Sequence, residues 1–436
     1  MKAIIWIQYS LLSILALCFT ANVHAQSLKY EHLGFNDALS KAKRTNQILF
    51  IQLESDCLQC NDVAASGLSG DELNTLFSKF VCLKVLNNSE DYKQILSTYH
   101  IYPNLPTSLF VDSKGNYLAS LNNFSTSNKN EYFKLAAKAL ATKENPPFQP
   151  YTDAIAKNGL RRESLKTFIT KLNELNFNTD SLLENYIEYL TIRELRDETE
   201  LSFLIQSAPL VNSRVYNLIR LDYLLFKKVF ESFPMDERIK INQNVLTKSK
   251  SKLFREKSQD YLYYVNNFIR GMYGESKREG FKAAEKLDLE FYKEAKKDYN
   301  TYYNLARGYY RDFYGKLNID SVRTIEMNRI IKRPDGSFTK GGMLYQTGNE
   351  LNDIAFTIFE STDDKEKLAF ALKLSEMTLK YNVPAFIDTY AKILYRFGGK
   401  KDAIDWQKKA IAISDSLHLA HNGLKEALTK MQAGTL

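Results

Sequence analysis

The sequence has few residues of the kinds that build metal centres and disulfide scaffolds. Its 436 residues include only 4 Cys and 5 His. It shows no Gly-rich phosphate loop, metal-binding His pair or serine-nucleophile motif, so hydrolytic and nucleotide-dependent chemistry have no support. We expect no cofactor and no metal. So few cysteines in so long a chain do not make a structural scaffold, which leaves them for chemistry.

Long hydrophobic runs are lacking after the first 25 residues. There, Lys2 precedes a mostly apolar run at 4–19, and small residues follow at the expected cleavage position. This pattern predicts a secretory signal peptide over residues 1–25, because the run is shorter than the roughly 20 residues that span a bilayer. We expect an exported protein, periplasmic or extracellular, without a stable membrane span. Lipid anchoring at Cys18 is not expected, because Leu17 stands where such sites have a small residue.

Neither sign of charge dominates the chain. The 59 Lys and Arg exceed the 51 Asp and Glu only slightly, for a formal net charge of +8. The basic residues are scattered, which is typical of a solvated helical surface. Tyr and Phe are dense between residues 261 and 314 and alternate with Lys and Arg, a combination that can stack on nucleic-acid bases. We favour helix packing for these aromatic residues and expect no nucleic-acid partner.

The most informative motif present is Cys57-Leu58-Gln59-Cys60. It follows the apolar run at 48–51, where a strand is expected to give way to a helix. Two thiols at this spacing can close a disulfide across the first helical turn, and the helix N-terminus lowers the pKa of the leading thiol. Cys57 is therefore expected to be the nucleophile that attacks a substrate disulfide. Cys60 is expected to be the thiol that resolves the mixed disulfide.

The same spacing also serves zinc sites and structural disulfides. A zinc site needs two more thiols or imidazoles, and neither Cys82 nor the histidines form a ligand pattern around the pair. A merely structural disulfide stays open as an alternative to a redox-active one. Cys82 alternates with Leu83 in a predicted strand, which is typical of a small buried hydrophobic residue.

The residues around the motif predict a regular succession of helices and strands. Leu105-Pro106-Thr107 stands before the third strand. Helices are expected at 35–43, 70–79, 91–99 and 131–142, and strands at 48–51, 81–86, 108–111 and 116–121. This order, with CxxC after the first strand and Pro-Thr before the third, resembles the thioredoxin fold over residues 28–143. The first helix is similar to that of one branch of thioredoxin-like proteins, through Phe35, Ala38, Leu39, Ala42 and Lys43.

The resemblance implies where a substrate would lie. In thioredoxin-like proteins the proline of this motif follows a cis peptide bond and lies beside the disulfide. Pro106 would accordingly be cis, and Leu105, Pro106 and Thr107 would offer their main chain to an extended substrate.

The sequence departs from the thioredoxin pattern near the cysteines. Asp56 stands where the family usually has Trp, and Ile51 stands where thioredoxins keep a buried Asp. Glu54, Asp56 and Asp62 are acidic and no lysine is adjacent, so we expect them to raise the pKa of Cys57 against the effect of the helix N-terminus. The nucleophile would then be slow at neutral pH, as in a thiol-disulfide exchanger with few substrates.

The remaining sequence changes character after a proline-rich linker at 145–152. Residues 153–436 have helical periodicity, with one extended interruption at 333–342. Near the C-terminus the spacing of small and aromatic residues resembles a tetratricopeptide repeat, and a degenerate copy precedes it by about 36 residues. We therefore expect tetratricopeptide-like helical hairpins over about 351–434. The residues that carry this spacing are Tyr390, Ala391, Leu394, Gly398, Ala403, Trp406 and Ala410.

Taken together, the patterns predict an α/β thioredoxin-like domain over 26–144 and an all-α domain over 153–436. The expected function is that of an exported thiol-disulfide oxidoreductase, of the disulfide reductase or isomerase type, that contributes to cell redox homeostasis. Its partners would be protein thiols or disulfides, an unidentified electron-transfer partner, and a protein bound by the helical region. The alternative is a non-catalytic binding or scaffold protein with a passive disulfide.

Overall fold

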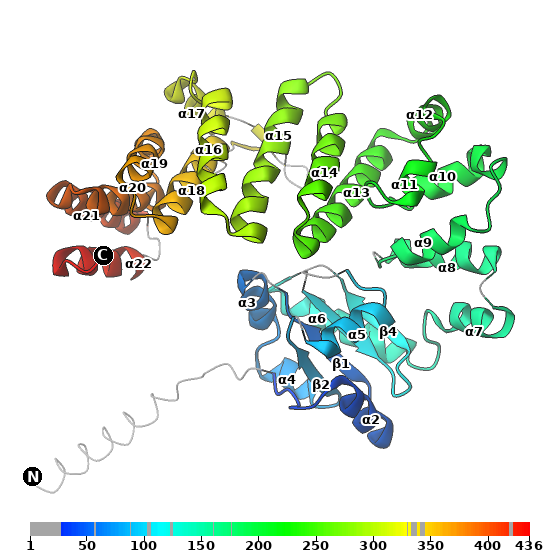
Figure 1. Ribbon diagram of the computed structural model, residues 1–436. Coiled ribbons are helices and arrows are strands. Elements are labelled where there is room, and N and C mark those ends of the chain that lie inside the picture. Colours follow the sequence, from blue (N-terminus) through cyan, green and yellow to red (C-terminus); the bar gives the residue numbers. More distant parts are fainter. Residues whose placement is uncertain are drawn as a thin grey trace, which may run out of the picture. The chain divides into compact units, whose positions relative to one another are not determined.

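The computed structural model divides into two compact units, Met1–Arg255 and Glu256–Leu436, which are described separately. The first unit contains a β-sheet with helices, and the second is largely helical (Figure 1). The expected signal peptide, Cys18, Asp56, Cys57, Leu105 and most of the interruption at 333–342 lie outside the described residues. Those residues are 28–55, 58–87, 89–102, 106–122, 125–159, 161–175, 177–328, 330–332, 338–340, 345–417 and 422–436.

The first unit is organised around a four-stranded mixed sheet in the order β2-β1-β3-β4. Strand β1 (Leu49–Leu53) lies parallel to β2 (Val81–Val85) and antiparallel to β3 (Thr107–Val111). Strand β4 (Tyr117–Leu121) pairs antiparallel with β3. All residues of β1 are buried, which explains why this strand reads as an almost continuous apolar run. The predicted α/β class of the N-terminal region is confirmed.

The helices of this region occur before, between and after the strands in the order that the sequence predicts. They are α2 (Phe35–Thr45), α3 (Leu58–Gly67), α4 (Asp71–Phe77), α5 (Glu90–Thr98) and α6 (Lys129–Thr142). Phe50 of β1 and Phe110 of β3 have ring centroids 4.8 Å apart and pack with Phe77 of α4, in a core that also includes Tyr132 of α6. Because alternate residues of a strand share a face, this core identifies the face of the sheet that α4 and α6 cover.

The outer edge of β2 is covered by the segment that precedes α2. Glu31 forms an isolated parallel bridge with Leu83, and its N–H donates to the carbonyl oxygen of Cys82 at 2.8 Å. This contact occupies hydrogen-bonding groups that an edge strand would otherwise expose.

The first unit continues beyond the sheet with helices α7 to α13. The first of these begins inside the expected linker, because Pro150 stands in its first turn, where a missing N–H costs little. The expected domain boundary at this linker stays a prediction. The helices are α7 (Gln149–Asn158), α8 (Arg162–Glu174), α9 (Asp180–Ile187), η1 (Glu194–Arg196), α10 (Glu198–Gln206), α11 (Arg214–Leu218), α12 (Tyr223–Ser232) and α13 (Met235–Glu256).

Aromatic contacts attach these helices to the sheet. Phe148 stacks on Tyr117 of β4 with ring centroids 4.5 Å apart, and Phe177 meets the same tyrosine edge-on at 5.1 Å. The N–H of Asn178 donates to the carbonyl oxygen of His100 at 2.5 Å. The sheet and the helices that follow it therefore share one packed core within the first unit.

The second unit is helical except for a short ribbon of β5 (Ile330–Lys332) and β6 (Phe338–Lys340). These strands flank residues 333–337 of the expected interruption. The helices are α14 (Gln259–Met272), α15 (Lys277–Glu290), η2 (Phe291–Lys296), α16 (Tyr299–Phe313), α17 (Ile319–Asn328), α18 (Gln346–Ser361), α19 (Lys365–Thr378), η3 (Leu379–Tyr381), α20 (Pro384–Phe397), α21 (Lys400–Ser416) and α22 (Asn422–Ala433). The predicted helical class of this region is confirmed.

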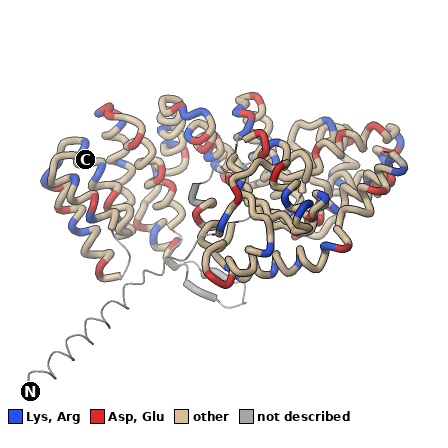
Figure 2. The backbone as a smooth tube through the Cα atoms, turned by 90° about the horizontal axis from the view of Figure 1, so that it is seen from below, with Lys and Arg blue, Asp and Glu red and all other residues tan. Residues whose placement is uncertain are grey.

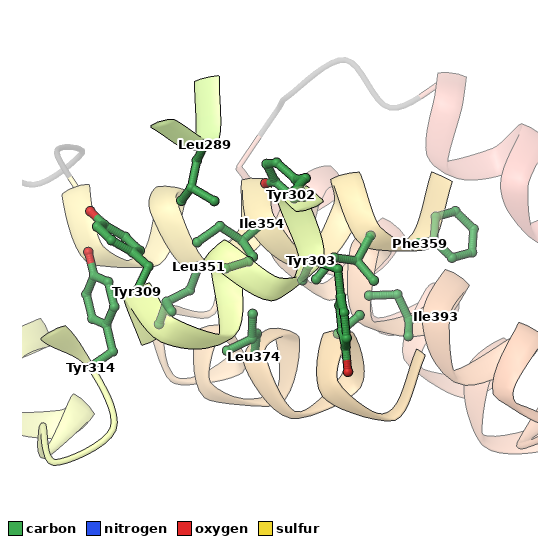
Figure 3. Packing of buried hydrophobic residues seen from close by; sticks show 14 of the residues in the cluster. Leu289, Tyr302, Tyr303, Tyr309, Tyr314, Leu351, Ile354, Phe359, Leu374 and Ile393 are labelled. Carbon is green, nitrogen blue, oxygen red and sulfur yellow. The ribbon is translucent and has the colours of Figure 1, made fainter. Parts of the chain in front are cut away.

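The dense aromatic residues of α16 form part of the core of the second unit. Tyr302, Tyr303 and Tyr309 pack with Leu351 and Ile354 of α18 (Figure 3). Helix packing therefore accounts for these buried tyrosines, whereas Tyr263, Tyr264 and Tyr299 are exposed.

A half-buried carboxylate binds the tyrosine hydroxyls at one end of this aromatic core. Glu350 accepts hydrogen bonds from the hydroxyls of Tyr314 and Tyr309 and from Nζ of Lys286, at 3.3 Å for Tyr309 and 3.0 Å for Lys286. Burial alone would raise the pKa of Glu350, but the hydrogen bonds and the nearby lysines hold it below its usual value. The tyrosine hydroxyls are thus satisfied inside the core.

Successive C-terminal helices pack against each other, α18 with α19 and α20 with α21. Ala391 and Ala403 are fully buried where α20 meets α21, and the rings of Tyr390 and Trp406 lie 5.4 Å apart. The close approach that the small residues predict is therefore present. The assignment of these helices as tetratricopeptide-like stays a prediction.

Replacing Leu351 by Ala should destabilise the second unit. Leu351 has no exposed surface, so the substitution leaves a cavity and should lower the free energy of unfolding by about 2–5 kcal/mol. Urea unfolding followed by circular dichroism would measure the change. Leu417→Ala is the matched control, because Leu417 is 56% exposed and should change stability by less than about 0.5 kcal/mol. Equal effects of the two variants would contradict this assignment of the core.

Candidate functional site

The candidate site lies where the strands of the sheet end, at the edge formed by the last residues of β1 and β4 and the first residue of β3. Leu53, the last residue of β1, pairs with Thr107, the first residue of β3. Leu121 at the end of β4 lies opposite Ser108 of β3. The chain that leaves β1 toward the CxxC motif, the chain that enters β3 through Pro106 and the chain that leaves β4 therefore share this edge.

The structure describes four of the predicted site residues, Glu54, Cys60, Pro106 and Thr107. Pro106 is buried and Thr107 has no exposed surface. Glu54 directly follows β1, and Pro106 and Thr107 stand at the start of β3, so these three residues lie at the same edge of the sheet. Cys57, Asp56 and Leu105 lie outside the described residues. The peptide bond before Pro106 includes Leu105, so its cis form stays a prediction.

Cys60 lies in the first turn of α3 and is half-buried. It is disulfide-bonded, and its carbonyl oxygen accepts a hydrogen bond from Oγ of Ser125 at 2.8 Å. Ser125 belongs to the segment after β4. This hydrogen bond ties the start of α3 to the third segment at the site.

Asn61 holds the segment that leads into the cysteine pair. Its Oδ1 accepts from the N–H of Ser55 at 2.9 Å, and its Nδ2 donates to the carbonyl oxygen of Ser55 at the same distance. Ser55 is almost fully buried. These two hydrogen bonds join the residues on either side of the CxxC motif, a role that the sequence analysis did not assign to Asn61.

An ion pair changes the charge expected at the site. Nζ of Lys84, from β2, forms an ion pair with Glu54, whose N–H donates to the carbonyl oxygen of Val85 at 3.0 Å. Lys84 is thirty residues away in sequence, so reasoning from near neighbours omitted it. Its charge offsets part of the negative potential expected from Glu54. A raised pKa of Cys57 stays a prediction, with Asp56 as its remaining acidic neighbour in sequence.

A neutral polar network lies inside the sheet beside the site. Gln52 of β1 is 5% exposed, and its Oε1 accepts a hydrogen bond from Oγ of Ser108 on β3 at 2.5 Å. The hydroxyl of Tyr132 lies 3.5 Å from the carbonyl oxygen of Ala64 in α3. Burial raises the pKa of Tyr132, while a hydrogen bond with Ser108 opposes that rise. None of these side chains takes up a proton at neutral pH.

Ile51 is fully buried and follows the alternation of the strand, so its side chain and that of Gln52 point to opposite faces. Gln52 is the polar residue in an otherwise apolar run. This interruption is the sequence signal that could have indicated the network, but it did not indicate the partner, because Ser108 is 56 residues away.

Cys82 is a free thiol and is 4% exposed. Its Sγ lies 3.5 Å from the carbonyl oxygen of Phe77. Burial, with a smaller contribution from the charge of Glu31, raises the pKa of Cys82 to about 12. The prediction of a small buried hydrophobic residue at this position is confirmed.

The part of the chain that the structure describes was searched for metal-binding clusters and for membrane-spanning helices. Within it, no group of three or more His, Cys, Asp or Glu residues could hold a metal ion. No described helix combines the length and apolarity needed to cross a membrane. Figure 2 shows Lys and Arg interspersed with Asp and Glu along the helices.

Comparisons with protein-family models and with curated proteins find no match to this chain.

Replacing Asn61 by Ala should loosen the segment before the cysteine pair. The variant removes all three hydrogen bonds between Asn61 and Ser55 and should lower the free energy of unfolding by about 1–3 kcal/mol. It should also change the alkylation rate of the reduced cysteine pair, measured with iodoacetamide across a pH series. Asn130→Ala, at an exposed position of α6, is the control and should alter neither quantity. An unchanged alkylation profile in Asn61→Ala would argue against a positioning role.

The free thiol of Cys82 should resist labelling in the folded protein. In a Cys57→Ser, Cys60→Ser variant, Cys82 is the sole cysteine of residues 26–436. Burial and a raised pKa leave about one thiol in ten thousand ionised at pH 8, so Ellman's reagent should react slowly until guanidinium unfolds the chain. The thiol count before and after unfolding tests this expectation. Equal reaction rates in the two states would mean that the thiol is accessible.

Proposed function

We propose that this chain is a thiol-disulfide oxidoreductase with a thioredoxin-like domain, in which Cys57 and Cys60 exchange electrons with disulfides of other proteins. The observation that carries the proposal is the pairing of Leu53 with Thr107, which brings the segment before the cysteines and the Pro-Thr segment to one edge of the sheet. The four-stranded mixed sheet with its helices is loosely compatible with the thioredoxin resemblance.

In the proposed reaction the Cys57 thiolate attacks one sulfur of a substrate disulfide. The substrate S–S bond breaks, a Cys57–substrate disulfide forms, and the other substrate sulfur leaves as a thiolate. The Cys60 thiolate then attacks the Cys57 sulfur and releases the second substrate thiolate. Two electrons pass to the substrate and a Cys57–Cys60 disulfide remains. A second dithiol protein would reduce this disulfide and complete the cycle, and the same steps reversed would oxidise a substrate.

In this proposal the residues around the cysteines either position the cysteine segment or affect the transfer of its protons. Asn61 and Ser125 position the start of α3 and the chain on either side of it. The thiol of Cys60 must lose a proton before it attacks, and the neutral pair of Gln52 and Ser108 offers no base for that step. Solvent or the departing substrate thiolate would take the proton. The exchange would therefore be slower than in a thioredoxin with a buried carboxylate.

In this proposal the N-terminal segment determines where the protein acts, and the C-terminal helices determine which protein it binds. Export follows from the predicted signal peptide at 1–25. The buried small residues between α20 and α21 support a tetratricopeptide-like module at about 351–434, which would bind a partner protein.

A non-catalytic role for the same domain is the second candidate. The neutral Gln52–Ser108 pair favours it, because a domain that no longer cycles has no need of a buried proton acceptor. In that case the cysteine pair would be a passive disulfide and the sheet domain would serve for docking.

Replacing Cys60 by Ser should trap the proposed mixed disulfide. Cys57 could still attack a substrate, but the resolving thiol would be missing, so adducts should accumulate in the protein's own compartment. Non-reducing gels would detect them, and dithiothreitol should release the partners. Cys57→Ser is the control and should form no adducts.

The absence of adducts in Cys60→Ser, together with a cysteine pair that stays oxidised in cells, would favour the docking role. A separate assay tests the range of substrates. Reduction of insulin by the purified chain as fast as by an ordinary thioredoxin would overturn the proposal of a narrow-range exchanger.

A further inference from the structure

A large cavity lies beside the candidate site within the first unit. Its volume is about 770 Å³, which is within the range of about 300–1,000 Å³ that ligand pockets occupy. Its walls come from α8, α10 and α13 and from two residues of the sheet region, Tyr102 and Asn122. The cavity is thus enclosed by helices for which the redox chemistry gives no role.

The two sheet residues connect the cavity with the candidate site. Tyr102 stands four residues before Pro106, in the chain that enters β3. Asn122 directly follows β4, whose last residue lies opposite Ser108. Asn122 therefore lies directly beside the edge of the sheet where β3 begins, and Tyr102 lies close to Pro106 along the chain. Because Asn122 lines the cavity, the cavity begins next to that edge of the sheet.

Buried contacts hold the wall of the cavity in shape. Lys248 of α13 is 9% exposed, its Nζ donates to the carbonyl oxygen of Ser207 at 3.0 Å, and it lies 5.6 Å from the centre of the Tyr102 ring. Nδ2 of Asn122 donates to the carbonyl oxygen of Leu175 at 3.3 Å. These contacts join the sheet to the helices directly at the cavity, so the wall is formed before a ligand binds.

The chemistry of the walls indicates the kind of ligand. Apolar surface from Phe177 and Phe203 alternates with amide and hydroxyl side chains, among them Asn244 and Thr247. Charged residues of both signs are present, so the cavity lacks the single-sign cluster that would select a phosphate or another small ion. Amides and hydroxyls pair with peptide groups, and aromatic faces accept apolar side chains.

We propose that this cavity binds an extended polypeptide segment of the substrate, next to the cysteine that exchanges with Cys57. The inference rests on the proposed function and adds the element that selects the substrate. Residues of α8, α10 and α13 would recognise the sequence that flanks the reactive cysteine. A peptide of about ten extended residues, which spans about 33 Å, is long enough to place residues on both sides of the reactive cysteine.

Two disulfide probes test the proposal on the full-length reduced protein. The first is a mixture of peptides of about ten residues, with randomised flanks around one cysteine that carries thionitrobenzoate. The second is free cysteine that carries the same group. Attack by Cys57 releases coloured thionitrobenzoate, so the two rate constants compare reaction with and without flanking residues. The wild-type chain should react faster with the peptides.

Blocking the cavity should remove this preference. Asn244 lines the cavity and is half-buried, so Asn244→Trp should fill part of it. We expect this variant to slow the peptide reaction by about tenfold, equivalent to about 1.4 kcal/mol, and to leave the cysteine reaction unchanged. Gln243→Trp is the matched control, because Gln243 is exposed on the same helix and does not line the cavity. Thr247→Trp, at an exposed lining position, replaces Asn244→Trp if that variant does not fold.

The possible outcomes separate the two proposals. Unchanged peptide rates in both lining variants, or an equal loss with both probes, would overturn the peptide cavity while leaving the oxidoreductase intact. A wild-type chain that prefers free cysteine would point to a small-thiol ligand and would also overturn it. The proposed function itself fails if wild type and Cys57→Ser release thionitrobenzoate equally slowly from both probes.

Discussion

The antiparallel pairing of β1 with β3 ends at Leu53 and Thr107, and the candidate site depends on where it ends. A shift of this register by one residue would turn Gln52 and Ser108 away from each other and leave both polar groups without their partner in the sheet. It would also move the chain before the CxxC motif relative to Pro106. The buried hydrogen bond between Gln52 and Ser108 is therefore a contact that only the observed register satisfies.

The second constraint is the aromatic packing between the sheet and the helices that follow it. Phe148 lies against Tyr117 and also contacts Phe168 of α8 with ring centroids 5.8 Å apart. These rings set the position of α8, which forms part of the cavity wall, relative to β4. A sheet domain without α7 to α13 would expose this aromatic surface to water. The sheet that carries the candidate site and the helices α7 to α13 thus belong to one folded unit.

The sequence predicted the features that depend on local patterns. Apolar runs and turn residues were enough to place β1 to β4 and the helices between them, and alternation was enough to bury Cys82. The tyrosines of α16 were correctly assigned to packing because their spacing is helical. The thioredoxin resemblance and the roles of Cys57, Leu105 and Pro106 remain predictions that the described residues do not test.

The remaining features depend on partners far apart in sequence. Lys84 reaches Glu54 because β2 lies beside β1, and Ser125 reaches Cys60 across 65 residues. Neither contact has a local signal. The polar interruption at Gln52 indicates that a buried partner is needed but does not identify Ser108. The division into two units after Arg255 also has no local signal. It falls at the end of α13, where the sequence has no cluster of proline or glycine.

The bridge between Glu31 and Leu83 gives the start of the folded chain a protective role. Without it, β2 would be an uncovered edge strand in which four of the five side chains are buried and Lys84 alone is exposed. Such an edge can pair with the same edge of another molecule and begin aggregation. Processing that removes residues beyond the expected cleavage point would expose this edge. Loss of the segment around Glu31 would therefore favour aggregation even if the rest of the sheet stayed folded.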